Sequence, residues 1–201
     1  MTQIDRRRLL GSGLALGAAA GALALAAPGR ARAAAPMGED GLHKPSWLKI
    51  TFKDMTEDLE TAAAEGKRML VLWEQRGCIY CRKMHEEVFP EPEIAAALSE
   101  KFYVVQMNLF GDEEVTDFDG EALPEKDMAK KWGVFFTPTM MFMPDSVPEG
   151  PAGPAAVATM PGAFGKGTTQ DLLTWVLEKG YETDEHFQKY HARKINERRG
   201  G

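Results

Sequence analysis

The only two cysteines of the chain, Cys78 and Cys81, are separated by two residues, a spacing at which a disulfide can form and break reversibly. They follow an apolar run at residues 69–73 and open a stretch of helical pattern at residues 82–98. Unpaired N–H groups at a helix N-terminus stabilise a thiolate at Cys78. Cys81, one turn later, can attack a mixed disulfide formed on Cys78 and release the partner. We predict a redox-active disulfide with Cys78 as nucleophile, Cys81 as resolving cysteine and no other cofactor.

Other uses of a cysteine pair fit the sequence less well. A closed zinc site needs four ligands, but the chain has no second cysteine pair, and of its histidines only His85 lies nearby in sequence. A c-type haem site needs a histidine directly after the second cysteine, where Arg82 stands. A purely structural bridge over two residues would constrain the unfolded chain little. We expect no metal, and we keep as alternative functions a metallochaperone that binds Cu(I) through the two thiolates and a redox-inert binding module.

The first 33 residues have the composition of an export signal. Arg6 and Arg7 precede a stretch rich in leucine, alanine and glycine at residues 9–27, and an Ala-x-Ala site ends at Ala33. The arginine pair is typical of the twin-arginine route, which exports folded proteins. We predict that the signal is cleaved near Ala33 and that the mature protein is periplasmic. The alternative is that the stretch is retained as a membrane anchor.

Charge and length limit the partners of the mature chain. The full chain has a net charge of −6 at pH 7, and cleavage after residue 33 would remove five arginines and one aspartate, which makes the charge more negative. This acidic balance argues against a nucleic-acid partner. The remaining residues, about 168 of 201, suit one domain with a single core, which we expect to be monomeric.

The pattern of apolar residues predicts alternating helices and strands. Helices are expected at residues 54–66, 81–98, 125–132 and 168–179, and strands at residues 68–74, 102–109, 139–143 and 155–160. Pro90 and Pro92 interrupt the second helix, because proline cannot continue helical hydrogen bonding. The acidic segment 110–124 is interpreted as a solvated surface insertion. The chain thus divides into a lead-in at 34–53, a domain at 54–180 and a polar extension at 181–201 with a frayed end.

A second motif lies downstream of the cysteines. Residues 132–139 read Trp-Gly-Val-Phe-Phe-Thr-Pro-Thr and resemble the thioredoxin-family segment in which a cis proline precedes a central strand. In that family the proline lies against the cysteine pair, and the free backbone of the preceding residue receives the substrate chain. The resemblance implies a cis bond before Pro138 and substrate binding at Thr137 and Pro138. It also implies an α/β thioredoxin fold, a central mixed β-sheet flanked by helices on both faces.

Residues 66–85 and 111–120 narrow the resemblance to the SoxW-type branch of the thioredoxin-like proteins, over about residues 54–179. This implies a periplasmic thiol-disulfide oxidoreductase of a sulfur-oxidation system. Such a protein receives electrons from a membrane thiol transporter and reduces protein disulfides or cysteine adducts on a carrier protein. An oxidant or isomerase role is the alternative, because the reduction potential and the electron donor decide the net direction.

The chain departs from ordinary thioredoxin around its cysteines. Gly77 stands where a tryptophan is usual, and Ile79 and Tyr80 replace the central Gly-Pro pair. We assign Gly77 and Tyr80 to substrate binding, since they flank or lie inside the motif.

The proton acceptor of thioredoxin is also missing, because Leu72 occupies the position of its buried aspartate. Glu74 is the nearest carboxylate in sequence and is a candidate for proton transfer with Cys81; the alternative is an exposed charge at the strand end. His85, four residues after Cys81 on the helix, could share a face with that sulfur. We expect instead that His85 packs in the interior or points to solvent.

Overall fold

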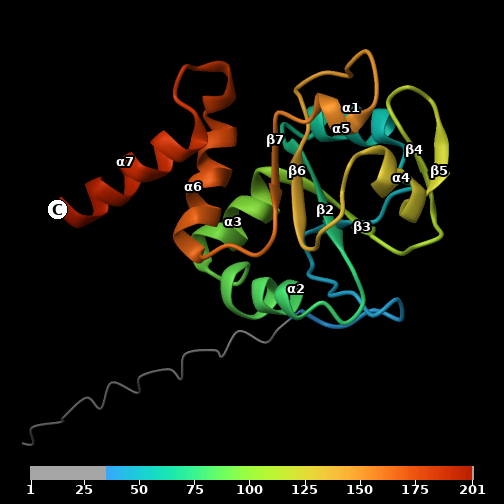
Figure 1. Cartoon of the computed structure of the whole chain (residues 1–201), viewed down its shortest axis with the longest axis horizontal. Helices are drawn as coiled ribbons and strands as arrows, with labels where there is room; N and C mark the ends of the chain where they lie inside the picture. Colours follow the sequence, from blue (N-terminus) through green and yellow to red (C-terminus); the bar gives the residue numbers. More distant parts are fainter. Residues whose placement is uncertain (1–34, 201) are drawn as a thin grey trace, which may run out of the picture. The chain divides into compact units, whose positions relative to one another are not determined.

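The computed structural model describes residues 35–200, so the predicted export signal lies outside the described residues. The main sheet has five strands in the order β1-β3-β2-β6-β7 (Figure 1). Its strands are β1 (Leu48–Lys49), β2 (Arg68–Glu74), β3 (Phe102–Asn108), β6 (Thr139–Phe142) and β7 (Ala158–Pro161). The first three pair in parallel and the last two add antiparallel, which confirms the predicted mixed sheet. No helix within residues 35–200 combines the length and the apolar composition needed to cross a bilayer.

The register of the central strands determines what lies beside the cysteines. β2 and β6 are antiparallel, and Trp73 near the end of β2 pairs with Thr139 at the start of β6. The segment that follows β2 and the segment that precedes β6 therefore meet at one edge of the sheet. Cys78 lies in the first of these segments and Pro138 in the second.

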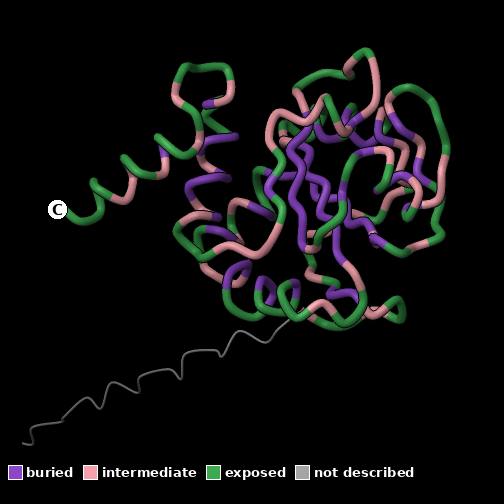
Figure 2. The backbone as a smooth tube through the Cα atoms, in the orientation of Figure 1, coloured by how far each residue is buried: buried purple, intermediate pink, exposed green. Residues whose placement is uncertain are grey.

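Helices cover both faces of the sheet, as Figures 1 and 2 show. They include α1 (Met55–Ala64), α3 (Pro92–Glu100), α4 (Glu125–Lys131) and α6 (Lys166–Leu177). Successive strand residues point to opposite faces, so Met69 and Trp73 of β2 pack with residues of α1 and α4, whereas Leu70 and Leu72 pack with residues of α3 and α6. Burial on both faces explains why β2 is apolar without alternation.

The helix that carries the cysteines begins earlier than predicted. α2 (Ile79–Lys83) starts directly after Cys78 and runs into a π-helical segment, η1 (Met84–Val88). The predicted interruption at the prolines is confirmed. Pro92 opens α3 at a position where no N–H is needed for helical hydrogen bonding.

The predicted strand at residues 155–160 has the wrong start. A short helix, α5 (Ala152–Ala155), occupies the end of the Pro/Gly-rich connection, and β7 begins only at Ala158. The last helix of the predicted domain starts at Lys166 rather than at residue 168. These boundaries shift because the antiparallel partner β6 pairs with residues 158–161, a long-range constraint.

The polar extension is helical over the residues that the structure describes, and fraying at its end stays a prediction. After a 3₁₀ turn (Gly180–Glu182), α7 (Phe187–Gly200) packs on α6. Tyr190 is buried between them, and Arg198 donates to both carboxylate oxygens of Asp171 at 2.8 Å. Contacts with α6 therefore stabilise a helix whose own sequence has little apolar character.

The acidic segment 110–124 forms a hairpin of β4 (Glu114–Thr116) and β5 (Ala122–Pro124). Its centre is anchored in the interior, because Asp117 is 1% exposed and accepts hydrogen bonds from Trp132 Nε1 and from the backbone N–H of Ala152, both at 2.8 Å. The interpretation as a solvated insertion is therefore wrong for Asp117, although the glutamates around it are exposed.

Candidate active site

Cys78 and Cys81 form a disulfide at the start of α2, with their Cα atoms 5.2 Å apart. Cys78 is the N-cap of the helix, and its sulfur accepts a hydrogen bond from the Cys81 N–H at 3.0 Å. The Cys78 residue is partly exposed, whereas Cys81 is only 2% exposed. A partner can therefore approach the sulfur of Cys78 and not that of Cys81, and the helix N-terminus stabilises negative charge on Cys78.

Thr137 and Pro138 lie beside the Cys78 sulfur. The peptide bond between them is cis, as the family resemblance implied. Thr137 Oγ1 lies 3.4 Å from Cys78 Sγ, and the carbonyl oxygen of Thr137 lies 3.5 Å from the same sulfur. A chain that reacts at Cys78 would thus pass directly over the backbone of Thr137.

Exposed apolar side chains adjoin both parts of this site in the sequence. Ile79 and Tyr80 follow Cys78, Phe135 and Phe136 precede Thr137, and each of the four is between 59% and 67% exposed. Gly77 precedes Cys78 with a φ of 73°, a left-handed conformation that glycine adopts without steric cost. The sequence interpretation included Tyr80 and Gly77 but missed the two phenylalanines. Two adjacent aromatic residues directly before Thr137 were the available signal.

Glu74, at the end of β2, is only 1% exposed, so the alternative of an exposed strand-end charge is wrong. Its Oε1 lies 2.9 Å from His85 Nε2, and its Oε2 accepts a hydrogen bond from Gln106 Nε2 at 2.5 Å. Glu74 lies two residues beyond Leu72, so strand alternation places both on the same face of the sheet. Glu74 therefore lies on the same face of β2 as Leu72, which occupies the position of the buried aspartate of thioredoxin, but two residues further along the strand.

His85 is buried, so it packs in the interior, the first of the two expected placements, and does not point to solvent. Its ring stacks on that of His43, with centroids 4.4 Å apart and planes 14° from parallel. Trp47 and Phe89 also contact it, stacked at 6.3 Å and edge-on at 5.0 Å. The ring is thus held on several sides with Nε2 directed at Glu74.

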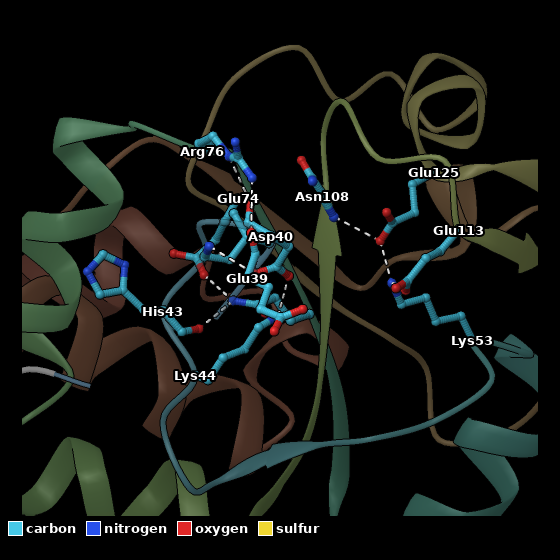
Figure 3. Close-up of polar contacts among 12 residues, drawn as sticks. Glu39, Asp40, His43, Lys44, Lys53, Glu74, Arg76, Asn108, Glu113 and Glu125 are labelled. Carbon is cyan, nitrogen blue, oxygen red and sulfur yellow. Dashed lines mark hydrogen bonds and ion pairs between the residues drawn. The ribbon is translucent and has the colours of Figure 1, made fainter. Parts of the chain in front are cut away.

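His43 belongs to the lead-in and was missed by the sequence interpretation. Burial lowers its pKa below the usual value, the neighbouring His85 adds to this, and Glu74 opposes it. Gln106 donates to the His43 carbonyl oxygen at 2.9 Å and in turn accepts from Lys44 Nζ at 2.6 Å (Figure 3). Nothing in the sequence singles out His43, because its contacts depend on how the lead-in folds back over β2 and β3.

A cavity of about 140 Å³ connects these groups to the disulfide. His43, Glu74, Cys78 and Cys81 all contribute to its lining. The space is large enough for several water molecules. The carboxylate and the resolving cysteine therefore border a common space.

A larger open groove, about 1160 Å³, lies between the lead-in and the end of β3. Lys53 spans it and contacts Glu113 and Glu125, the latter at 2.5 Å (Figure 3). Glu125 also accepts the N–H of Asn108 at 2.9 Å, and its burial raises its pKa despite Lys53. Neither cysteine lines this groove, and these charges satisfy one another.

Comparisons with known proteins concern the fold of the chain. Residues 55–150 match a family model described as a thioredoxin-like domain. A thioredoxin-fold protein from Helicobacter pylori is 17% identical with a TM-score of 0.52, over 72% of this chain and 97% of the other. A thioredoxin from Thermus thermophilus is 23% identical with a TM-score of 0.49, over 63% and 86%. The reduced C-terminal domain of DsbD from Neisseria meningitidis is 16% identical with a TM-score of 0.41, over 61% and 90%. The comparison with curated proteins gives no match.

The domain match and the Helicobacter pylori structure establish that the chain has a thioredoxin fold. Within that fold, the disulfide stands at the N-terminus of the helix after β2, beside a cis proline. This is an arrangement in which a dithiol and a disulfide can interconvert.

Proposed function

We propose that this chain, a thioredoxin-like thiol-disulfide oxidoreductase, acts in the periplasm as a reductant of protein disulfides or of cysteine adducts on a carrier protein in a sulfur-oxidation pathway. The observation that carries the proposal is the division of the pair into a partly exposed, helix-capping Cys78 and a buried Cys81. The SoxW-like residues 66–85 and the arginine pair of the N-terminal segment support the pathway and the compartment.

The reaction proceeds by two exchanges at sulfur. The Cys78 thiolate attacks one sulfur of the substrate disulfide, a mixed disulfide forms, and the other substrate sulfur leaves as a thiolate. Cys81 then loses its proton and attacks the sulfur of Cys78, which releases the second substrate sulfur and closes the Cys78–Cys81 disulfide. Two electrons pass to the substrate. We assign the proton of Cys81 to Glu74, which borders the same cavity.

The substrate chain binds across the Cys78 sulfur. Its backbone lies along Thr137 and Pro138, and the carbonyl oxygen and hydroxyl group of Thr137 are within 3.5 Å of that sulfur. Its apolar side chains contact the exposed rim formed by Tyr80, Phe135 and Phe136. Backbone contacts tolerate many sequences, so the rim supplies the preference for a partner.

A reductant in an oxidising compartment needs continuous electron delivery. Exposed dithiols there become oxidised unless a donor restores them. We therefore propose a membrane thiol transporter as the donor to Cys78. Without it the pair would accumulate as the disulfide.

Trapping with cysteine variants tests this proposal. Cys81→Ser should accumulate mixed disulfides through Cys78 in the periplasm, because the resolving thiol is gone. Cys78→Ser, the matched control, should trap none, since Cys81 is buried. The trapped partners should include a carrier protein bonded through its adduct-bearing cysteine. Trapping by Cys78→Ser alone would reverse the assignment, and failure of the wild-type protein to reduce insulin with dithiothreitol as donor would contradict the activity.

A further inference from the structure

Three buried titratable side chains gather behind the disulfide from three separate segments. Glu74 ends β2, His85 lies in the π-helical segment, and His43 comes from the lead-in, outside the residues that match the thioredoxin-like domain. Their side-chain donor atoms lie within 4.8 Å of one another. Buried charged or titratable groups are costly, so such a cluster calls for an explanation.

Two imidazoles and a carboxylate are also the donor set of many zinc sites. The ring geometry argues against a shared metal here. A metal bound to an imidazole nitrogen lies close to the plane of that ring, and the rings of His43 and His85 are stacked 14° from parallel with centroids 4.4 Å apart. One ion cannot lie in both planes, and both oxygens of Glu74 already meet donors, His85 and Gln106.

The contacts of Glu74 with His85 and Gln106 allow this cluster to take up a proton instead of a metal ion. With Glu74 ionised and His85 neutral, the hydrogen-bonded pair carries one buried negative charge, and uptake of one proton brings it to zero. The 2.9 Å contact between Glu74 Oε1 and His85 Nε2 keeps its own proton, and the added proton goes to a remaining lone pair of the Glu74 carboxylate or to His85 Nδ1. Gln106 donates to the other carboxylate oxygen in both states. Cys81 and Glu74 line one cavity, so water there can carry the proton between them.

We propose that Glu74 and His85 form a two-residue proton acceptor for Cys81, and that His43 of the lead-in is a positioning residue that holds His85 against Glu74. The inference rests on the proposed dithiol–disulfide cycle. When Cys81 attacks the mixed disulfide, its proton passes to the pair and the substrate sulfur leaves as a thiolate. The pair afterwards returns the proton to that thiolate or to water.

His43 suits the positioning role because it is neutral at pH 7. Burial lowers its pKa, and His85 and Arg82 act in the same direction, while Glu74 and Glu86 oppose them. The other side chains around the His85 ring, Trp47 and Phe89, are apolar. At a pH low enough for His43 to gain a proton, its positive charge would face His85. That charge would make it harder for His85 to accept a proton.

The two chemical steps can be followed in one experiment. The reduced full-length protein reacts with 5,5′-dithiobis(2-nitrobenzoate), and absorbance records one thionitrobenzoate released by Cys78 and a second released when Cys81 resolves the mixed disulfide. Glu74→Gln and His85→Phe should slow the second release on the order of 10²-fold at pH 7. The first release should change little. Glu87→Gln, an exposed change on the same helical segment, is the matched control and should behave as wild type.

His43 is tested by rescue. His43→Ala removes the stacked ring and should slow the second release, whereas His43→Phe restores a ring and should recover most of the lost rate. His43→Phe should also lack the extra loss of rate that wild type shows at the acidic pH at which His43, whose pKa is lowered by burial, gains a proton. Circular dichroism and urea unfolding identify any variant that fails to fold. If His85→Phe fails to fold, His85→Gln, which can still donate to Glu74, replaces it.

The outcomes separate the two proposals. If wild type gives both releases but Glu74→Gln and His85→Phe leave the second unchanged, or slow both equally, the proton-acceptor inference is wrong and the activity stands. Stoichiometric zinc that disappears in His43→Ala would also overturn it. If wild type gives no second release at all, the proposed dithiol–disulfide cycle itself fails.

Discussion

Replacement of Asp117 by alanine should destabilise the protein severely, because this carboxylate anchors the hairpin of β4 and β5 to the segment that leads to the active site. Asp117 accepts hydrogen bonds from Trp132 Nε1 and from the Ala152 N–H. Trp132 packs edge-on against Trp73 at the end of β2, with centroids 5.6 Å apart. Asp117 is therefore linked, through Trp132, to β2, the strand that precedes the cysteines.

The expected loss follows from the donors left without a partner. A buried donor without an acceptor costs about 1–3 kcal/mol, so two of them give about 4 kcal/mol. Lys131 adds little, because it keeps ion pairs with Asp119 and Glu121. The total stability of such a domain is about 5–15 kcal/mol, so Asp117→Ala should lose a large part of it.

Urea unfolding, followed by circular dichroism, measures the free energy of unfolding. Asp119→Ala is the matched control, since Asp119 lies two residues away and also binds Lys131 but is partly exposed, and it should cost far less than Asp117→Ala. Asp117→Asn retains one acceptor oxygen and should fall between the two. Equal losses for Asp117→Ala and Asp119→Ala would refute the reasoning that burial and unpaired donors dominate.

Two further predictions concern pH and backbone conformation. Burial raises the pKa of Asp58 to about 6, so its contribution to stability is complete below pH 4 and is lost as the pH rises through 6. Asp58→Asn should remove most of that loss, on the order of 2–3 kcal/mol, when unfolding is compared at pH 4 and pH 7.5; an unchanged dependence would contradict the assignment. Gly77→Ala should cost about 1–2 kcal/mol in urea unfolding, because φ is 73° with open space around a Cβ. Gly165→Ala, at a φ of −71°, carries no such backbone strain and should cost less, through weaker capping of α6 alone.

The chemistry of the cysteine pair could be predicted from sequence because it depends on local structure. Cys78 caps a helix, and the residues that decide this lie within one turn of it. Pro138 could be placed beside the pair only through the family resemblance, since the contact depends on the antiparallel pairing of β2 with β6. Phe135 and Phe136 were visible in the motif but carried no local signal of exposure.

The groups behind the disulfide could not be predicted in the same way. Glu74 and His85 are eleven residues apart, and their contact requires the turn after β2 to bring the helix back over the strand end. From the sequence, neither strand alternation nor the following turn decided the orientation of Glu74. His43 stacks on His85 through a lead-in whose path depends on Gln106 of β3.

The C-terminal helix shows the limit of composition. Residues 187–200 are mostly polar, and only Tyr190 among them is buried. Their order comes from partners on α6, chiefly Asp171, which binds Arg198 and contacts His191 Nδ1 at 2.6 Å. A sequence pattern indicates the apolar face of a helix. It does not indicate that a charged residue on a neighbouring helix, here Asp171, will bind the helix.

The central claim, a reducing dithiol–disulfide couple at Cys78 and Cys81, is tested most directly by its equilibrium reduction potential. The protein is equilibrated in glutathione and dithiothreitol buffers, alkylated, and scored by mass for free thiols. The account predicts one two-electron transition at a potential near that of thioredoxin, about −270 mV. A transition near −120 mV, as in a strong oxidant, or no transition over the whole range, would contradict it.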